Sequence, residues 1–166
     1  MAQPYVDDLL ATVDRACDEL RTVDPAVAAW RPAPGHWSAK EIIGHLIDSA
    51  ANNHQRFVRA RWQDDLIFAG YRQDDWVDSQ DYQSAEWDDL LVLWRQYNRH
   101  LARVMAGTPP AILRRLHARH NLDEIAWRTV PVTQPATLDY FMSDYVGHLH
   151  HHLAQLRERL DAATAR

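Results

Sequence analysis

The stretch TLDYFMSDYVGHLHHHLAQLRERL, residues 137–160, decides which fold the sequence predicts. Its apolar side chains recur at intervals of three and four residues, which is the spacing of one face of an α-helix. This face is formed by Leu138, Phe141, Met142, Tyr145, Leu149, Leu153, Leu156 and Leu160. We therefore predict one long amphipathic helix that begins near Thr137 and needs apolar partners along its length.

Three earlier segments show the same spacing and can supply those partners. The first covers residues 6–20. The second begins at Ser38, because Ser38 and Glu41 form the pattern of a capping box, and it extends to about residue 61. The third covers residues 84–107 and stops at a Gly-Thr-Pro-Pro sequence. Four long amphipathic helices predict an all-α fold, a four-helix bundle.

The connections between these helices differ in character. Residues 62–83 carry aromatic residues among many Asp and Gln with no lasting period, so we predict a long loop after the second helix. Its aromatic residues are equally consistent with packing onto the bundle and with a lid over a site. Before the last helix we expect a helical turn in residues 109–116. An irregular or extended excursion with weak strand character is expected in residues 122–132.

Composition limits the possible function classes. The chain is 46% hydrophobic, enough for the core of a single domain over residues 1–166. Its net charge of −5, without a basic cluster, argues against binding to nucleic acid or to an anionic membrane. No signal-peptide pattern and no apolar run of about 18 residues is present, so we expect a cytoplasmic protein. Cys17, the single cysteine, is predicted to be a core residue.

The predicted last helix carries four of the ten histidines. At about 100° per residue, His148 and His152 fall on one border of the apolar arc, whereas His150 and His151 point elsewhere. Imidazoles four residues apart on a helix have β-carbons about 5–6 Å apart and can converge on one metal ion. The pair is therefore a possible half-site, although a run of histidines can equally be a solvated helix face.

A third ligand must come from another helix if a metal ion is to be enclosed. In the second predicted helix, His45 lies at one edge of the apolar arc and His54 at the other. From its position alone, His45 is better explained as a hydrogen-bonded histidine at the boundary of the core. The remaining histidines outside the last helix are expected in loops or among charges, and they are His36, His100, His117 and His120.

Two motifs, GHWSAKEIIGHL at residues 35–46 and HLHHHLAQ at residues 148–155, together resemble the DinB superfamily, also described as DinB/YfiT-like metalloenzymes. In that family a Trp-Ser opening leads into a helix with one histidine, and a His-x-x-x-His pair lies on the last bundle helix. The resemblance spans nearly the whole chain and implies a metal site formed by His45, His148 and His152. Many members have Arg-Gly before the glutamine where this chain has Leu-Ala, which we expect to affect helix packing more than ligation.

Several polar residues lie near this expected site. Asp48 and Asp144 are one turn from His45 and His148, where they could orient the imidazoles or act as bases, although for each alone a surface position is the simpler explanation. Arg56 lies about 16 Å along the helix from His45, too far to reach a metal-bound atom but able to meet the carboxylate of an extended substrate. The substrate pocket is predicted to comprise Ser49, Asn52, Arg56, Tyr71, Trp76 and Tyr145.

The resemblance implies one divalent metal ion, and an all-imidazole site suits zinc, nickel or iron. Three neutral histidines leave a coordination position open, as in catalytic sites. Some relatives join low-molecular-weight thiols such as bacillithiol or mycothiol to electrophiles, so the leading hypothesis is a metal-dependent thiol transferase with a small-molecule substrate. A metal-dependent hydrolase is the second hypothesis, and a non-catalytic metal- or ligand-binding bundle is the third. Members often pair through helix faces, which implies a homodimer.

Overall fold

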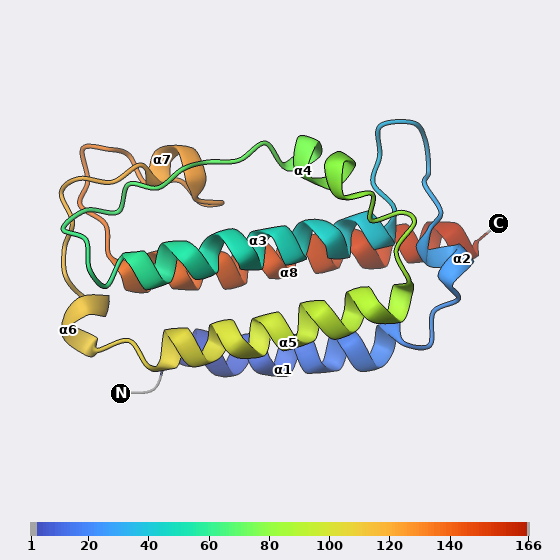
Figure 1. The fold of residues 1–166 in the computed structure, drawn as a ribbon, viewed down its shortest axis with the longest axis horizontal. Helices are drawn as coiled ribbons and strands as arrows, with labels where there is room; N and C mark the ends of the chain where they lie inside the picture. The colour runs from blue at the N-terminus through green and yellow to red at the C-terminus, as the bar shows by residue number, and fades with distance from the viewer. Residues whose placement is uncertain (1–2, 166) are drawn as a thin grey trace.

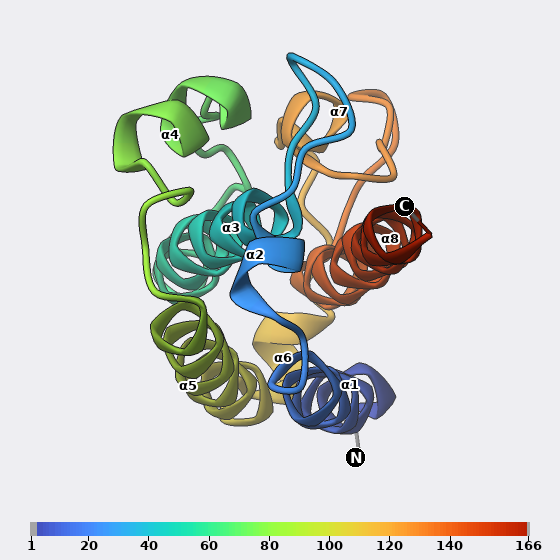
Figure 2. The same ribbon diagram turned by 90° about the vertical axis from the view of Figure 1, so that its right-hand side faces the viewer.

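The computed structural model describes residues 3–165, and four long helices dominate it (Figure 1). They are α1 (Pro4–Leu20), α3 (Ala39–Arg59), α5 (Trp87–Ala106) and α8 (Leu138–Thr164). Viewed down the bundle, α3 and α8 form one layer above α5 and α1 (Figure 2). The predicted all-α four-helix bundle is confirmed. In the described part of the chain, no helix is long and apolar enough to cross a membrane.

The start of α3 follows the predicted capping box. The Ser38 hydroxyl accepts a hydrogen bond from the backbone N–H of Glu41 at 3.3 Å, and the Glu41 carboxylate accepts one from the backbone N–H of Ser38 at 2.8 Å. These two contacts satisfy N–H groups that a helix end otherwise leaves unpaired. The Glu41 carboxylate also pairs with Arg31, which ties the preceding loop to the helix. The start of α3, and with it the position of His45, is therefore set locally.

The core is built from large aromatic side chains as well as aliphatic ones. Trp87, Trp94, Phe57 and Phe141 are all fully buried between the four helices. Burial of each such side chain contributes about 2–3 kcal/mol to the free energy of unfolding. The indole N–H of Trp87 donates to the carbonyl of Leu20 at 3.0 Å, so its polar atom is satisfied inside the core. Cys17 is buried as predicted.

The segment after α3 is more ordered than predicted. Residues 62–83, expected to be a loop, contain the helix α4 (Gln73–Gln80). Its sequence shows no helical period because Val77 is its one buried residue. The helix ends at Asp81, whose backbone is left-handed with φ of 46°. A turn from Asp81 to Ser84 follows, so that α5 begins three residues later than predicted, at Trp87.

The region before α8 confirms one prediction and corrects another. The helical turn expected in residues 109–116 is α6 (Pro110–Leu113). The weak strand expected in residues 122–132 is wrong, because Leu122–Ile125 forms the helical turn α7. Extended pairing occurs instead at isolated bridges that involve His117 and His120. These two histidines lie in loops as expected, but they are buried and contact the backbone carbonyls of Asp64 and Gln134.

Two short helical segments lie on the outer side of the α3–α8 layer. Both views place α4 and α7 above α3 and α8, on the side away from α1 and α5 (Figures 1 and 2). The remaining short helix, α2 (Pro25–Ala28), lies at the end of the bundle where α3 begins and α8 ends. The helices α3 and α8 run antiparallel. Their layer is covered by α1 and α5 on one side and by α4 and α7 on the other.

Alanine in place of Gly44 tests how α3 packs against the segment that follows α4. A β-carbon at position 44 would lie 2.0 Å from Cδ2 of Tyr82. Alanine normally stabilises a helix interior by about 1 kcal/mol relative to glycine, so any loss of stability has to come from displacing the Tyr82 ring. We expect Gly44→Ala to lower the free energy of unfolding by about 1–3 kcal/mol, measured by urea denaturation.

The control is Gly70→Ala, whose β-carbon would come no closer than 3.8 Å to a side-chain atom of Ile125. We expect this variant to be as stable as the wild type or slightly more stable. A Gly44→Ala protein that unfolds at the same urea concentration as the control would contradict the packing described for Tyr82.

Candidate metal centre

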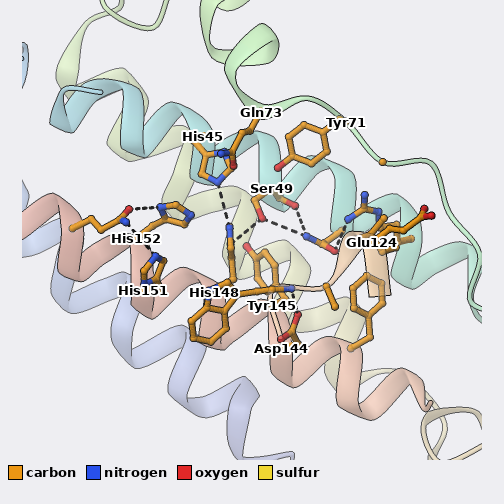
Figure 3. Close-up of a pocket in the computed structure, with 18 residues that line it drawn as sticks. His45, Ser49, Tyr71, Gln73, Glu124, Asp144, Tyr145, His148, His151 and His152 are labelled. Carbon is orange, nitrogen blue, oxygen red and sulfur yellow. Dashed lines mark hydrogen bonds between the residues drawn. The ribbon is translucent and has the colours of Figure 1, made fainter. Parts of the chain in front are cut away.

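Three histidines from two helices meet between α3 and α8. His45 comes from α3, and His148 and His152 come from consecutive turns of α8. One ring nitrogen from each lies within 4.8 Å of the others, and Nε2 of His45 is 3.4 Å from Nε2 of His148. Figure 3 shows the three rings turned toward one another. The structure therefore brings together the three residues that the sequence predicted as ligands.

The second ring nitrogens show which atoms are available to a metal. Nδ1 of His152 is 2.8 Å from Oε1 of Gln155, so it donates its proton there and leaves Nε2 with a free lone pair. Nδ1 of His148 is 3.5 Å from the Ser49 hydroxyl. Nδ1 of His45 is buried and has no hydrogen-bond partner within residues 3–165. Partners on the non-ligating nitrogens orient the imidazoles of metal sites, and two of the three are present here.

The contact between His45 and His148 indicates that a cation fits this site. Two neutral imidazoles whose Nε2 atoms face each other at 3.4 Å can share only one proton there, so at least one of these Nε2 atoms has a lone pair that points toward the other ring. A divalent ion at the centre would accept all three Nε2 lone pairs at once, so the donor set suits a metal that binds imidazole.

Burial also keeps the three imidazoles in the form that binds metal. Desolvation is the main cause that lowers the pKa of His45 to about 3, of His148 to about 2 and of His152 to about 4. The neighbouring imidazoles lower these pKa values further by charge repulsion. All three rings are therefore neutral at pH 7, as ligation requires.

A cavity of about 540 Å³ extends from the three histidines along the groove between α3 and α8. It is covered by two roof segments, residues 70–73 before α4 and residues 124–127 around α7. A volume of this size suits a small organic molecule. The lining residues used below are Ser49, Asn53, Arg56, Tyr71, Glu124, Trp127, Asp144, Tyr145, His151 and Gln155.

Comparison with known proteins agrees with this geometry. The sequence pattern of the DinB superfamily matches residues 7–156, which is most of the chain. The chain belongs to the DinB superfamily. It is 23% identical over 124 residues to the "Putative metal-dependent hydrolase YfiT" of Bacillus subtilis (strain 168), and this match covers 75% of the chain. The chain spans only 64% of the length of that relative.

A solved structure shows the same fold. YfiT from Bacillus subtilis, described as having an unusual four-helix bundle topology, superposes with a TM-score of 0.72 at 17% identity. The superposition covers 96% of this chain and 87% of YfiT. At this level of identity the comparison establishes the architecture, and the site of this DinB protein has to be argued from its own residues.

Four of the six predicted pocket residues line the cavity of this DinB protein. They are Ser49, Arg56, Tyr71 and Tyr145. Asn52 and Trp76 do not line it: the Asn52 amide donates to the backbone carbonyl of Asp48, and Trp76 packs against Tyr71 with ring centroids 5.0 Å apart. Asn53 takes the place expected for Asn52, because it lies on the side of α3 that faces α8.

The two predicted carboxylates are buried but do not contact the histidines. Oδ1 of Asp48 accepts hydrogen bonds of 2.7 Å from the Tyr82 hydroxyl and from the Gln80 amide, which holds the end of α4 against α3. Asp144 accepts the backbone N–H groups of Trp127 and Arg128, both at 2.8 Å. Each carboxylate therefore holds a segment above the bundle in place. Neither is a surface residue, and among the described residues neither contacts a histidine that it could orient.

One cavity residue was predicted to point elsewhere. His151 lies at the cavity beside His152, and its ring packs against Trp127 with centroids 5.5 Å apart. The amide of Gln155 lies between the two histidines, 3.1 Å from Nε2 of His151. The angular position of His151 on α8 predicted solvent exposure, and the residue is indeed exposed, although its ring also borders the cavity. His150 does point away, toward Asp8.

Alanine substitutions test the three ligands directly. We expect protein purified without a histidine tag to bind a divalent ion, and His45→Ala, His148→Ala and His152→Ala each to lose most of it, because two imidazoles hold an ion much less tightly than three. Elemental analysis after dialysis measures the metal content. His150→Ala on α8 and His54→Ala on α3 are matched controls that should keep the wild-type content. Full retention of metal in all three ligand variants would disprove the site.

The stability of the metal-free protein should depend on pH. An unfolded chain protonates histidine near pH 6.5, whereas the three folded imidazoles stay neutral down to about pH 4 or below. In that window the unfolded state binds more protons, so the free energy of unfolding falls as the pH is lowered from about 6.5. We expect a loss of about 1–2 kcal/mol per imidazole between pH 7.5 and pH 5, measured by urea denaturation.

The control for this pH dependence is a triple variant with His45→Gln, His148→Gln and His152→Gln. It removes the three buried imidazoles and keeps polar side chains of similar length. Its unfolding free energy should change less between the same two pH values. Equal changes in the variant and the wild type would mean that other groups cause the dependence.

Proposed function

We propose that this DinB protein is a metal-dependent transferase that joins a low-molecular-weight thiol to an electrophilic small molecule, with a divalent ion held by His45, His148 and His152. The proposal rests on the open donor set of three neutral imidazoles at one end of a covered cavity. A divalent ion in such a site lowers the pKa of a bound thiol or water.

Among the described residues, no free carboxylate lies beside the three histidines, and this observation favours a thiol as the nucleophile. The two cavity carboxylates among residues 3–165 are Asp144 and Glu124. Asp144 is occupied by backbone N–H groups, and Figure 3 shows Glu124 at the end of the cavity away from His45 and His152. A thiol with an ordinary pKa of about 8.5 is ionised by a metal without a protein base.

The proposed transfer forms one bond, breaks one bond and releases one proton. The thiol sulfur forms a bond to the electrophilic carbon, the bond from that carbon to its leaving group breaks, and the thiol proton passes to solvent. Burial raises the pKa of the Tyr71 hydroxyl to about 12, so this group remains a hydrogen-bond donor at neutral pH. It lies in the cavity near Ser49, where it can stabilise charge that develops on a leaving group.

The roof segments cover part of the cavity and thereby reduce the access of water to it. Trp127 packs closely over α8 at Gly147, where a β-carbon would come within 2.9 Å of its ring. Asp144 holds the backbone of the same segment, and the ring of Tyr71 covers the cavity from the other roof segment. Exclusion of water strengthens electrostatic interactions inside the cavity and protects a reactive electrophile from hydrolysis.

Metal-dependent hydrolysis is the second candidate. Its support is the name of the Bacillus relative, together with a site that can present a metal-bound water as readily as a thiol. The two candidates differ in what they consume. A hydrolase cleaves esters, amides or phosphate esters without added thiol, whereas a transferase consumes thiol and electrophile in equal amounts.

A turnover assay distinguishes these candidates. The protein is loaded in turn with zinc, nickel or iron and is incubated with bacillithiol, mycothiol, glutathione or cysteine and a panel of alkyl halides, epoxides and activated alkenes. We expect metal-dependent loss of free thiol with at least one pair, and the same treatment of His148→Ala should give only the uncatalysed rate. Thiol-independent cleavage of ester, amide or phosphate substrates would favour the hydrolase, and no thiol loss with any pair would refute the transferase.

A further inference from the structure

We propose that Arg56 is the anchor for a carboxylate of the substrate, so that the cavity selects molecules with a metal-binding group at one end and a carboxylate at the other. This inference rests on the proposed function for the identity of the metal-bound end. It assigns a second binding point to the same cavity and thereby a substrate class.

The first support is that Arg56 is a buried cation without a counter-charge. The residue is only 6% exposed and lines the cavity. Within residues 3–165 no carboxylate forms an ion pair with it. Desolvation is the main cause that lowers its pKa, and only the Tyr71 hydroxyl opposes this shift. Buried charges in proteins are normally paired, so the missing partner is expected to be a ligand.

Arg56 lies over the ring of Tyr71, 6.0 Å from its centroid, but none of the contacts that it makes among the described residues supplies a negative charge. One terminal nitrogen donates to the side-chain oxygen of Asn53 at 3.3 Å, and the other donates to the backbone carbonyl of Ala69 at 2.8 Å. Both acceptors are neutral. They use two of the five N–H groups of a guanidinium and hold it in one orientation, which leaves donors free for a planar carboxylate.

A continuous line of polar groups connects Arg56 to the metal centre. The Asn53 amide, which contacts Arg56, lies 3.4 Å from the Ser49 hydroxyl, and that hydroxyl lies 3.5 Å from Nδ1 of His148. His45, Ser49, Asn53 and Arg56 all line the cavity along α3. Arg56 lies about 16 Å along the helix axis from His45, and its guanidinium reaches back to Asn53, about one turn nearer to the histidines. A single extended molecule can therefore reach both ends.

The charge of the lining favours a carboxylate over a phosphate. Arg56 is the one arginine or lysine among the described residues of the cavity wall, whereas Asp144 and Glu124 are both part of it. A phosphate monoester carries a charge near −2 at neutral pH and is usually bound by several cations or backbone N–H groups. One guanidinium matches the single charge and the planar geometry of a carboxylate.

The experiment uses metal-anchored probes that contain no thiol. Monohydroxamates of succinic, adipic, suberic and sebacic acid carry a metal-chelating group at one end and a carboxylate at the other, at increasing separation. Their methyl esters have the same chain without the charge. Calorimetry on cobalt-loaded wild type, Arg56→Lys and Arg56→Gln gives the affinity ratio of each acid to its ester. This ratio cancels any general effect of the substitution on the metal site or on the roof.

We expect wild type to bind the acid about tenfold more tightly than the ester at one preferred chain length, as a factor of ten corresponds to an ordinary charge-assisted hydrogen bond. The affinity ratio of acid to ester should be near one in Arg56→Gln. It should be intermediate in Arg56→Lys, which keeps the positive charge but not the planar set of N–H donors. A wild-type ratio near one at every length, a ratio unchanged in Arg56→Gln, or no binding of any probe would overturn the proposal.

The test of the carboxylate anchor and the test of the transferase can give different results. Protein that prefers the acids through Arg56 but never consumes thiol would retain the carboxylate anchor and lose the transferase. Protein that consumes thiol but treats acid and ester alike would retain the transferase and lose the anchor.

Discussion

The desolvation of three imidazoles between α3 and α8 is the constraint on which the rest of this structure depends. Burial favours the neutral form of an imidazole, and here three imidazoles share one space, with Nδ1 of His45 left unpaired among the described residues. The antiparallel packing of α3 against α8 places His45 opposite the consecutive turns that carry His148 and His152. Neither helix can slide or rotate by one residue without exposing apolar core and separating these nitrogens. The requirements of the core and of the metal centre therefore coincide.

The roof of the cavity is fixed by buried carboxylates that take no part in ligation. Asp48 on α3 holds Tyr82 and Gln80, and Asp144 on α8 holds the backbone of residues 127–128. Burial raises the pKa of both carboxyl groups, and their hydrogen bonds oppose that effect. Each of the two site-forming helices thus carries histidine ligands and, about one turn away, a carboxylate that holds a segment above the bundle. The same helices position the metal site and its cover.

Sequence reasoning recovered the parts of this protein that follow a local pattern. The helical period placed α1, α3, α5 and α8, and the capping box of Ser38 and Glu41 placed the start of α3. The period also separated His148 and His152 from His150. His45 could not be distinguished from an ordinary boundary histidine by position, and the resemblance to the DinB superfamily identified it as a ligand.

The errors concern residues whose environment is made by distant segments. Helix α4 has too few buried residues to show a period, and the sequence does not show that the exposed His151 borders the cavity, because the segment around Trp127 that packs against its ring is distant in the chain. Asp48 and Asp144 look like surface carboxylates for the same reason, because their partners lie 32 to 34 and 16 to 17 residues away in the chain. A single sequence carries no direct signal for such contacts.

The distribution of charge along the cavity favours an anionic ligand. A divalent ion bound by three neutral imidazoles keeps its full charge of two, and one thiolate neutralises only half of it. At the other end Arg56 adds a further positive charge, while Asp144 is committed to backbone N–H groups of the roof. Glu124 in the cavity wall forms no ion pair with Arg56 among the described residues, so a neutral ligand would leave both positive charges without an anionic partner. The ligand that we propose, with a thiolate at one end and a carboxylate at the other, would compensate each charge where it lies and would join the metal centre and the arginine into one binding site.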